Sequence, residues 1–433
     1  MSATCGHAED PSHPIMIAEI IAAGSEMLTP HRQDTNSLFL TAQLNDLGVE
    51  VAFKTIVGDS LEHLADAART ALRRTDIIVF SGGLGPTEDD LTREAVASAL
   101  DIGLHRDAEI LASLYKRFAA RQMAMPRNNV KQADILDGAT VLVNPVGSAP
   151  GQMLDTSVDG YRKLVLLLPG PPRELKPLFT DVVKPLLAEI LPPRFIARRL
   201  LRMPLIPESQ VDARTAPIYQ QYTDVQTTIL AGHGEIQLHF FTSSTVLSEA
   251  QARVDELASR VEAEMQDAVF SAQGESLEEV VLLMLEMRHL TLAAAESCTG
   301  GLLGQRLTAV PNSSRAFLGG AIVYTPELKT RFADVPEEMI ERHGAVSPEV
   351  SRALAEGIRK RTGASLGISI TGLAGPNGGP PGPDEERPIG LVYIGLSDDR
   401  DTQVKELNLN GDREYIRWWA SQHALDLLRR TLL

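Results

Sequence analysis

Short apolar runs alternate with segments of helical spacing over the first hundred residues of the chain. Residues 15–23, 49–57 and 76–81 are apolar runs of strand length, while residues 37–47 and 61–73 repeat apolar side chains every three to four positions. The first pattern predicts strands and the second predicts amphipathic helices. Strands that alternate with helices predict a three-layer α/β domain built on a parallel sheet.

The middle of the chain follows a different pattern. Residues 175–190 and 211–222 have helical spacing, although Pro217 must interrupt or end the second helix. A strand is predicted at residues 195–205. Two further alternating runs, 225–230 and 235–241, flank Ala231-Gly-His-Gly234 and predict a hairpin, and an amphipathic helix follows over 247–265. These elements predict a small α+β unit.

Alternation of strands and helices returns after residue 275. Helical spacing covers residues 277–287, and strand-like runs begin at residues 291, 317, 364 and 389. Thr299 and Ser347 are predicted to cap the helices that follow them. We therefore predict an α/β protein with domains at 1–172, 173–274 and 275–433, in which the first and third are three-layer α/β domains.

Composition excludes several classes of protein. The net charge is −16, which argues against a nucleic-acid-binding face, and the middle unit has no basic Gly-x-x-Gly loop. No stretch approaches 18 uninterrupted apolar residues, so no membrane span is predicted. Residues 1–14 have neither the basic cluster nor the apolar core of a secretory signal. We expect a cytoplasmic protein.

Cysteine and histidine residues do not suggest a metal centre. Cys5 and Cys298 are the two cysteines, and they give neither a disulfide framework nor metal-ligand spacing. His233 and His239 have no second histidine or cysteine at ligand spacing, so we predict that they are a loop residue and a strand residue.

A glycine-rich loop follows the third predicted strand. Ser81-Gly-Gly-Leu-Gly-Pro-Thr-Glu-Asp-Asp-Leu-Thr92 runs from that strand into a helix. This order exposes backbone amides at the carboxyl end of a sheet, where phosphates bind. Asp89 and Asp90 could hold a divalent cation against a pyrophosphate, or they could only complement the helix dipole. The local sequence leaves both interpretations open.

A nucleophile is predicted in the third domain. Ala295-Glu-Ser-Cys-Thr-Gly-Gly301 ends a buried strand in small polar residues before a helix begins, so Ser297 and Cys298 lie beside amides that could stabilise an anion. The alternative is a small-residue turn that only lets the helix pack closely. Thr371-Gly-Leu-Ala-Gly-Pro-Asn-Gly-Gly379 is a second anion loop, and Arg413 begins the last helix; both suit a phosphorylated substrate.

These motifs carry a family resemblance. The third domain resembles the CinA C-terminal family of nicotinamide mononucleotide amidohydrolases. The resemblance rests on residues 295–301, Tyr324 with Lys329, and the segments 344–347, 371–376 and 411–413. The resemblance implies hydrolysis of the nicotinamide mononucleotide carboxamide to nicotinate mononucleotide and ammonia, without a cofactor. The implied roles are nucleophile for Ser297, general base for Lys329, proton relay for Tyr324, and substrate contact for Thr371, Gly372 and Arg413.

Two further predictions concern this pocket. We expect the N–H groups of Thr299 and Gly300 to form the oxyanion hole. Residues 379–387 are longer and richer in proline than the corresponding link in that family, which predicts a different lip around the pocket.

The first domain resembles the molybdopterin-binding-like domain of the same family. The resemblance rests on residues 81–92, 128–133, 144–151 and 168–175. Some members are ADP-ribose pyrophosphatases that use a divalent metal such as Mg²⁺, Mn²⁺ or Co²⁺. The resemblance implies that loop residues contact the phosphates: Gly82, Gly83, Gly85 and Thr87. It implies accessory contacts from Lys131 and Asn36. It also implies that Asp89 and Asp90 lie at the metal. The loop Thr29-Pro-His-Arg-Gln33 departs from the family pattern and is predicted to border the pocket.

Three alternatives stay open. Cys298 could be the nucleophile in place of Ser297. The protein could instead be a non-catalytic nucleotide-binding or interaction protein linked to competence or DNA damage. The middle unit resembles the family's small α+β spacer, which has been likened to a KH module; we predict a scaffolding role for it. Family resemblance also implies a homodimer.

Overall fold

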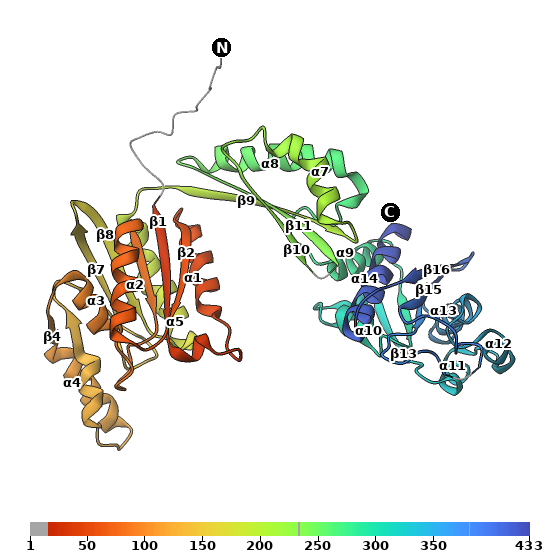
Figure 1. Ribbon diagram of the computed structural model, residues 1–433, viewed down its shortest axis with the longest axis horizontal. Helices are drawn as coiled ribbons and strands as arrows, with labels where there is room; N and C mark the ends of the chain where they lie inside the picture. The colour runs from red at the N-terminus through yellow and green to blue at the C-terminus, as the bar shows by residue number, and fades with distance from the viewer. Residues whose placement is uncertain (1–15, 233, 381) are drawn as a thin grey trace, which may run out of the picture. The chain divides into compact units, whose positions relative to one another are not determined.

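The computed structural model describes residues 16–232, 234–380 and 382–433 (Figure 1). Contacts between residues divide the chain into two units, Met1–Ala197 with Ser243–Ala250 and Arg198–Thr242 with Gln251–Leu433. The predicted three-domain boundaries therefore stay predictions. The predictions for residues 1–14, Cys5 and His233 lie outside the described residues.

A six-stranded mixed sheet forms the centre of the first unit, in the order β2-β1-β3-β8-β7-β6. Strands β1 (Ile17–Ala23), β2 (Glu50–Val57), β3 (Ile77–Ser81) and β8 (Tyr161–Leu168) are parallel. Strand β7 (Gly151–Val158) pairs antiparallel with β8, and β6 (Thr140–Leu142) pairs antiparallel with β7. The expectation of a parallel sheet was wrong at this edge. Asp159 and Gly160 both have positive φ, and such a two-residue turn joins neighbouring strands as a hairpin.

Helices cover both faces of this sheet, as predicted (Figure 1). Apolar side chains of α2 (Leu61–Arg74) and α3 (Thr92–Leu100) pack on one face, and those of α1 (Thr35–Asp46), α5 (Pro172–Leu178) and α6 (Lys184–Ile190) pack on the other. A π-helical turn, Phe179–Val183, joins α5 to α6. Helix α4 (Ala108–Ala120) and the strand pair β4 (Leu104–Arg106) and β5 (Asp134–Leu136) lie outside the main sheet.

The middle of the chain forms the predicted α+β arrangement. Strands β9 (Phe195–Pro204), β10 (Gln226–Gly232) and β11 (Glu235–Ser244) make a sheet in the order β10-β11-β9. The predicted hairpin is confirmed, because β10 and β11 pair antiparallel. Helix α8 (Leu247–Met265) matches its prediction, and α7 (Glu208–Tyr219) contains Pro217 in its last turn.

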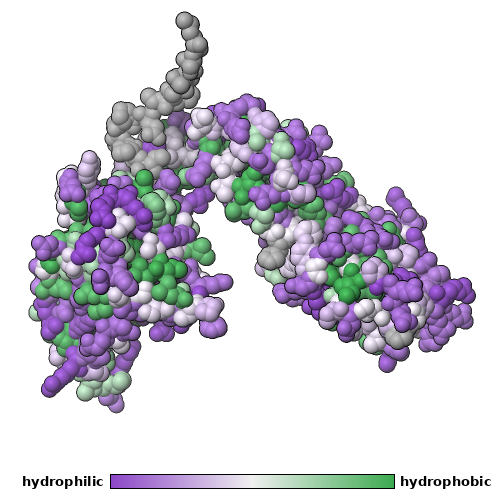
Figure 2. Space-filling model, viewed as in Figure 1, coloured by the Kyte–Doolittle hydropathy of each residue, from purple (hydrophilic) through white to green (hydrophobic). Residues whose placement is uncertain are grey.

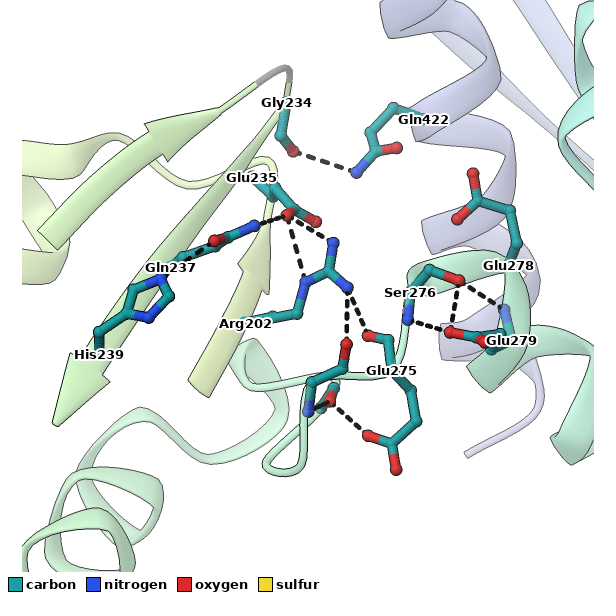
Figure 3. A network of polar contacts seen from close by, with 12 residues as sticks. Arg202, Gly234, Glu235, Gln237, His239, Glu275, Ser276, Glu278, Glu279 and Gln422 are labelled. Atoms are coloured by element: carbon teal, nitrogen blue, oxygen red, sulfur yellow. Dashed lines mark hydrogen bonds and ion pairs between the residues drawn. The ribbon is translucent and has the colours of Figure 1, made fainter. Parts of the chain in front are cut away.

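A polar network joins this sheet to the last helix of the chain (Figure 3). The Arg202 guanidinium pairs with Glu235 at 2.6 Å and donates to the carbonyls of Gly274 and Glu275. The amide nitrogen of Gln422 donates to the Gly234 carbonyl at 3.2 Å. These contacts explain why the hairpin belongs to the same unit as residues 251–433.

A five-stranded sheet, in the order β13-β12-β14-β15-β16, forms the C-terminal part of the second unit. Strands β12 (Leu292–Glu296), β13 (Phe317–Ile322) and β14 (Leu366–Gly372) are parallel. Strand β15 (Leu391–Ser397) pairs antiparallel with β14, and β16 (Thr402–Asn408) pairs antiparallel with β15. Every residue of β12 is buried. A strand buried on both faces indicates the three-layer arrangement that the sequence predicts.

Two sets of helices supply the outer layers of this part. Helices α9 (Leu277–Met287), α10 (Leu302–Thr308) and α14 (Arg413–Thr431) share one apolar cluster with the sheet. Helices α11 (Pro326–Ala333) and α13 (Pro348–Thr362), with α12 (Glu337–His343) beside them, contribute to a second cluster. The two clusters use alternate residues of β12, so they lie on opposite faces.

The predicted caps have different outcomes. Ser347 caps α13, because its hydroxyl accepts from the Val350 N–H at 3.3 Å. The prediction for Thr299 was wrong: α10 begins at Leu302, and its N-cap is Gly301 with φ of 94°. Two consecutive glycines with positive φ extend the turn beyond Thr299, and the Thr299 hydroxyl is buried without a hydrogen-bond partner.

Hydrophilic residues dominate the face of each unit that is visible in Figure 2. Among the described residues, no helix combines the length and apolar character needed to cross a membrane.

Candidate functional site

The turn after β12 places Ser297 at the carboxyl end of the second sheet. Its backbone N–H donates to the Ile370 carbonyl of neighbouring β14 at 2.9 Å, which fixes the turn to the sheet. Its side chain is 7% exposed. The Ser297 hydroxyl is therefore held at a strand end, where parallel sheets carry their sites.

Lys329 reaches Ser297 from α11, 32 residues later in the chain. Its Nζ lies 2.8 Å from Ser297 Oγ and 2.7 Å from the Val323 carbonyl oxygen. The side chain is 1% exposed, and burial lowers the pKa of Lys329 to about 8. A neutral amine can donate to Val323 and direct its lone pair at the Ser297 hydroxyl, so this pair has the geometry of a base and its nucleophile.

Cys298 lies next to Ser297 but faces the apolar core. The side chain is 4% exposed, and burial raises the pKa of its thiol to about 11. Because a thiolate is the reactive form, this thiol is poorly suited to attack. The geometry favours Ser297 over Cys298 as the nucleophile.

Glu296, the last residue of β12, is a site residue that the sequence analysis missed. Its buried carboxylate accepts the N–H groups of Gly301 and Leu303 at 3.0 Å and of Gly304 at 2.7 Å. These amides begin α10, so a protein carboxylate already occupies the helix end that we expected to face an anion. A signal was available, because a carboxylate at the end of an alanine-rich buried strand needs several donors.

The two predicted oxyanion donors differ in the structure. The Gly300 N–H donates to the Ser297 carbonyl at 3.0 Å, so it is committed to closing the turn. The Thr299 N–H has no such partner among the described residues. Arg417 of α14 donates to the Thr299 carbonyl at 2.6 Å and thereby fixes the peptide groups of this turn. Of the two predicted donors, Thr299 N–H is the one that the structure leaves open.

Arg413 and Tyr324 form a separate pair at the beginning of α14. Arg413 donates to the Tyr324 hydroxyl at 3.1 Å and to the Gly375 carbonyl at 2.8 Å. Both side chains are exposed. Tyr324 lies one residue beyond Val323, the acceptor of Lys329, but its hydroxyl pairs with Arg413 rather than with Lys329. In this structure the Tyr324 hydroxyl therefore does not bridge Ser297 and Lys329, as the predicted relay would require.

Thr371 and Gly372 have structural roles. Thr371 is fully buried, and its hydroxyl donates to the Ala345 carbonyl at 2.8 Å. Gly372 pairs with Val392 in the sheet, where an added Cβ would lie 2.7 Å from the Leu391 carbonyl oxygen. Thr371 therefore supports the segment before α13, and its hydroxyl is not available to a substrate in this structure.

The predicted phosphate loop lines a cleft of about 660 Å³ in the first unit. The carbonyls of residues 82–85 accept hydrogen bonds from Thr92 and Arg93, at the beginning of α3. Because a trans peptide points its N–H opposite to the preceding carbonyl, the amides of residues 83–85 point away from α3. Residues 83–85 also line the cleft. Arg93, which is fully buried, was missed by the sequence analysis.

The other predicted residues of this cleft mostly support the loop. Asp90 accepts from the N–H and hydroxyl of Thr87, and Lys131 donates to the Asp90 carbonyl at 2.5 Å. Asn36 is buried and donates to Ser81 Oγ and to the Gly170 carbonyl. Arg32 and Gln33 line the cleft, so the predicted border is formed by the end of the 29–33 loop, whereas residues 29–31 are not among the lining residues.

A metal site is not assembled around Asp89 and Asp90. Asp89 lines the cleft as Asp90 does, but the Asp90 carboxylate is engaged by Thr87 within the loop. Within the ranges that the structure describes, no three His, Cys, Asp or Glu side chains are grouped so as to hold a metal ion. The residues present do not form a complete ligand set for the predicted divalent metal.

Comparison with known proteins identifies relatives along nearly the whole chain. The CinA C-terminal domain family matches residues 274–432, and a family described as "Probable molybdopterin binding domain" matches residues 19–189. A CinA-like protein of Acidobacterium capsulatum is 58% identical over 418 residues, covering 96% of this chain and all of that protein. A CinA-like protein of Solibacter usitatus is 46% identical over 417 residues, covering 96% of this chain and 98% of that protein.

Solved structures of similar proteins cover part of the chain. The crystal structure of the protein CinA from Thermoplasma acidophilum is 35% identical, covers 39% of this chain and 95% of its own, and has a TM-score of 0.36.

Proposed function

Because the chain belongs to the CinA family, we propose that its C-terminal part hydrolyses the carboxamide of nicotinamide mononucleotide. The products are nicotinate mononucleotide and ammonia, which places the reaction in pyridine nucleotide recycling. The observation that carries the proposal is the buried contact of 2.8 Å between Lys329 Nζ and Ser297 Oγ. At pH 7 an ordinary surface lysine is neutral in far less than 1% of molecules, whereas a pKa lowered to about 8 makes Lys329 neutral in about a tenth of them.

The reaction proceeds in two halves. Neutral Lys329 takes the proton of the Ser297 hydroxyl as Oγ attacks the amide carbon, and a tetrahedral oxyanion forms. The Lys329 ammonium then gives that proton to the departing nitrogen, which leaves as ammonia while the acyl–serine ester remains. Water, deprotonated by Lys329, attacks the ester, and the Ser297 oxygen regains the proton as nicotinate mononucleotide leaves.

Other groups of the site would position the substrate. The Thr299 N–H is the candidate donor to the oxyanion, a contact worth about 3 kcal/mol in the transition state. Arg413 has exposed guanidinium nitrogens beside the Gly375 loop and would bind the phosphate of the nucleotide.

An ammonia-release assay with purified protein and nicotinamide mononucleotide tests the proposal. Wild-type protein should release ammonia and form nicotinate mononucleotide in equal amounts, and Ser297→Ala and Lys329→Met should each reduce kcat at least a thousandfold. Cys298→Ala is the matched control and should retain turnover. Loss of turnover in Cys298→Ala alone would assign the nucleophile to the thiol.

A second candidate function concerns the first unit. Residues 83–85 line the cleft while the carbonyls of Leu84 and Gly85 are bound by Arg93, which supports a site for a pyrophosphate nucleotide such as ADP-ribose at the backbone amides of this loop. Incubation with ADP-ribose and Mg²⁺, Mn²⁺ or Co²⁺ would yield AMP if this site is a pyrophosphatase. Binding without AMP formation would support the non-catalytic nucleotide-binding alternative for this unit.

A further inference from the structure

The proline-rich segment that departs from the family pattern is tied to the amidase centre by a buried carboxylate. Asp384 is 3% exposed and accepts the Ala345 N–H at 2.7 Å and the Val346 N–H at 3.3 Å. Its carboxylate also pairs with Arg387 at 3.0 Å. A carboxylate that is buried with three donors fixes the backbone that supplies them.

Arg387 completes the attachment from the same segment. Its guanidinium donates to the carbonyls of His343 at 2.6 Å and of Val346. Gly344, between these residues, has φ of 81°, and an added Cβ would lie 2.2 Å from Asp384 Oδ1. The backbone at 343–346 is therefore shaped to receive Asp384 and Arg387 together.

This backbone leads directly to the nucleophile. Ala345 donates its N–H to Asp384, and its carbonyl accepts a hydrogen bond from the Thr371 hydroxyl at 2.8 Å. Ile370, the neighbour of Thr371 in β14, accepts the Ser297 N–H at 2.9 Å. Three hydrogen bonds and the strand residues 370–371 thus connect Asp384 to the turn that carries Ser297.

We infer that Asp384 is a positioning residue for the amidase centre, which holds the 343–346 segment in place and supplies a buried negative charge that acts on the Lys329 amine. The inference rests on the proposed function of Ser297 and Lys329 and goes beyond it, because it assigns a role to a segment outside the nucleophile and base motifs.

The charges around Lys329 define the expected effect. Burial is the largest influence on Lys329 and lowers its pKa, while Cys298 and Asp384 act in the opposite direction. Arg387 faces Asp384 and offsets part of its charge. Arg413, at the beginning of α14, acts on Cys298. Removing the Asp384 charge should therefore make Lys329 easier to deprotonate, and removing Arg387 should make it harder.

Two variants of the same segment distinguish the effect of the Asp384 charge on Lys329 from the attachment of residues 343–346. Asp384→Asn keeps the size of the side chain and removes the charge, so the midpoint of the rising limb of kcat/KM against pH should move down by about half a unit or more. Arg387→Gln leaves Asp384 less neutralised and should move this midpoint up. Both variants weaken the attachment of residues 343–346, so a purely structural role would lower activity in both without shifts of opposite sign.

Glu386→Gln is the matched control, because it removes one carboxylate from an exposed position in the same segment. Its midpoint should stay within about 0.2 unit of wild type. A thermal melt of each variant verifies folding. Equal midpoints in wild type and Asp384→Asn, or shifts of the same sign in Asp384→Asn and Arg387→Gln, would overturn the inference.

A direct titration keeps this test independent of the substrate. Protein labelled with ¹³Cε-lysine, with Lys329→Met to assign the signal, reports the Lys329 midpoint by NMR. If wild type does not release ammonia, the proposed function fails. The inference about Asp384 is then tested by the Lys329 titration midpoints measured by NMR. The midpoint should be lower in Asp384→Asn than in wild type, and higher in Arg387→Gln.

Discussion

Replacing Glu296 by glutamine removes a negative charge from beneath the nucleophile turn while leaving the size of the side chain unchanged. One carboxylate oxygen accepts the N–H groups of Gly301 and Leu303 at 3.0 Å, and the other accepts that of Gly304 at 2.7 Å. The lower-energy orientation of the glutamine amide places its oxygen where it accepts the N–H groups of Gly301 and Leu303. Its NH₂ group then faces the Gly304 N–H, donor against donor.

The magnitude follows from these contacts. One buried N–H left without an acceptor costs about 1–3 kcal/mol, and the lost attraction between the carboxylate and the helix end adds about 0.5–1 kcal/mol. The smaller cost of burying a neutral amide offsets part of this. We expect a net loss of about 2–3 kcal/mol in the free energy of unfolding, which lowers the Tm by roughly 4–12 °C for a unit of this size.

Thermal unfolding followed by circular dichroism measures this loss, and ammonia release measures its effect on Ser297. The kcat of Glu296→Gln should fall with the Tm, because residue 296 directly precedes the nucleophile. Glu341→Gln removes an exposed carboxylate from α12 and should change stability by at most about 0.5 kcal/mol. If the two variants melt together, Glu296 does not stabilise α10 and our reading of this turn is refuted.

Three further predictions concern charges and buried groups. Because the base must be neutral, kcat/KM should rise with pH and level off above about 8, the lowered pKa of Lys329; an activity that is flat from pH 6 to 10 would exclude Lys329 as the base. Between about pH 8 and the ordinary lysine pKa of 10.5, the folded protein binds fewer protons than the unfolded chain. The free energy of unfolding of wild type should therefore rise relative to that of Lys329→Met over this range, by up to about 1.4 kcal/mol per pH unit. Urea titrations at pH 7.5 and 9.5 check the sign. Arg93→Met should weaken ADP-ribose binding by at least tenfold in calorimetry, because the carbonyls of residues 84 and 85 lose their donors, while Arg69→Met, at a more exposed arginine of the same unit, should bind as wild type does.

The sequence predicted elements with strong periodicity and failed where single side chains decide the geometry. Helix α8 was placed at its observed bounds, because its apolar side chains repeat along 19 residues. The beginning of α10 was misplaced, because Thr299 is an adequate cap by residue type. Only the positive φ of Gly300 and Gly301 shows that the turn continues.

The residue pattern also could not predict which side chains far apart in the sequence come into contact. Family motifs suggested Ser297 with Lys329, and the structure brings these side chains to hydrogen-bonding distance. The roles predicted for Tyr324 and Thr371 depend on the direction of each side-chain hydroxyl, and the spacing of residues in the sequence does not determine that direction. The role of Asp384 could not be found from local sequence, because its two backbone donors lie 38 and 39 residues earlier in the chain.

The contact between Arg417 and the Thr299 carbonyl spans 118 residues. A ribosome that adds about 5–20 residues per second therefore needs roughly 6–24 s between making the nucleophile turn and making the side chain that braces it. The nascent chain passes through this interval with Ser297 already synthesised but its turn not yet secured. The proposed amidase activity should therefore appear only after translation has passed α14, and a stalled chain ending before that helix should show none.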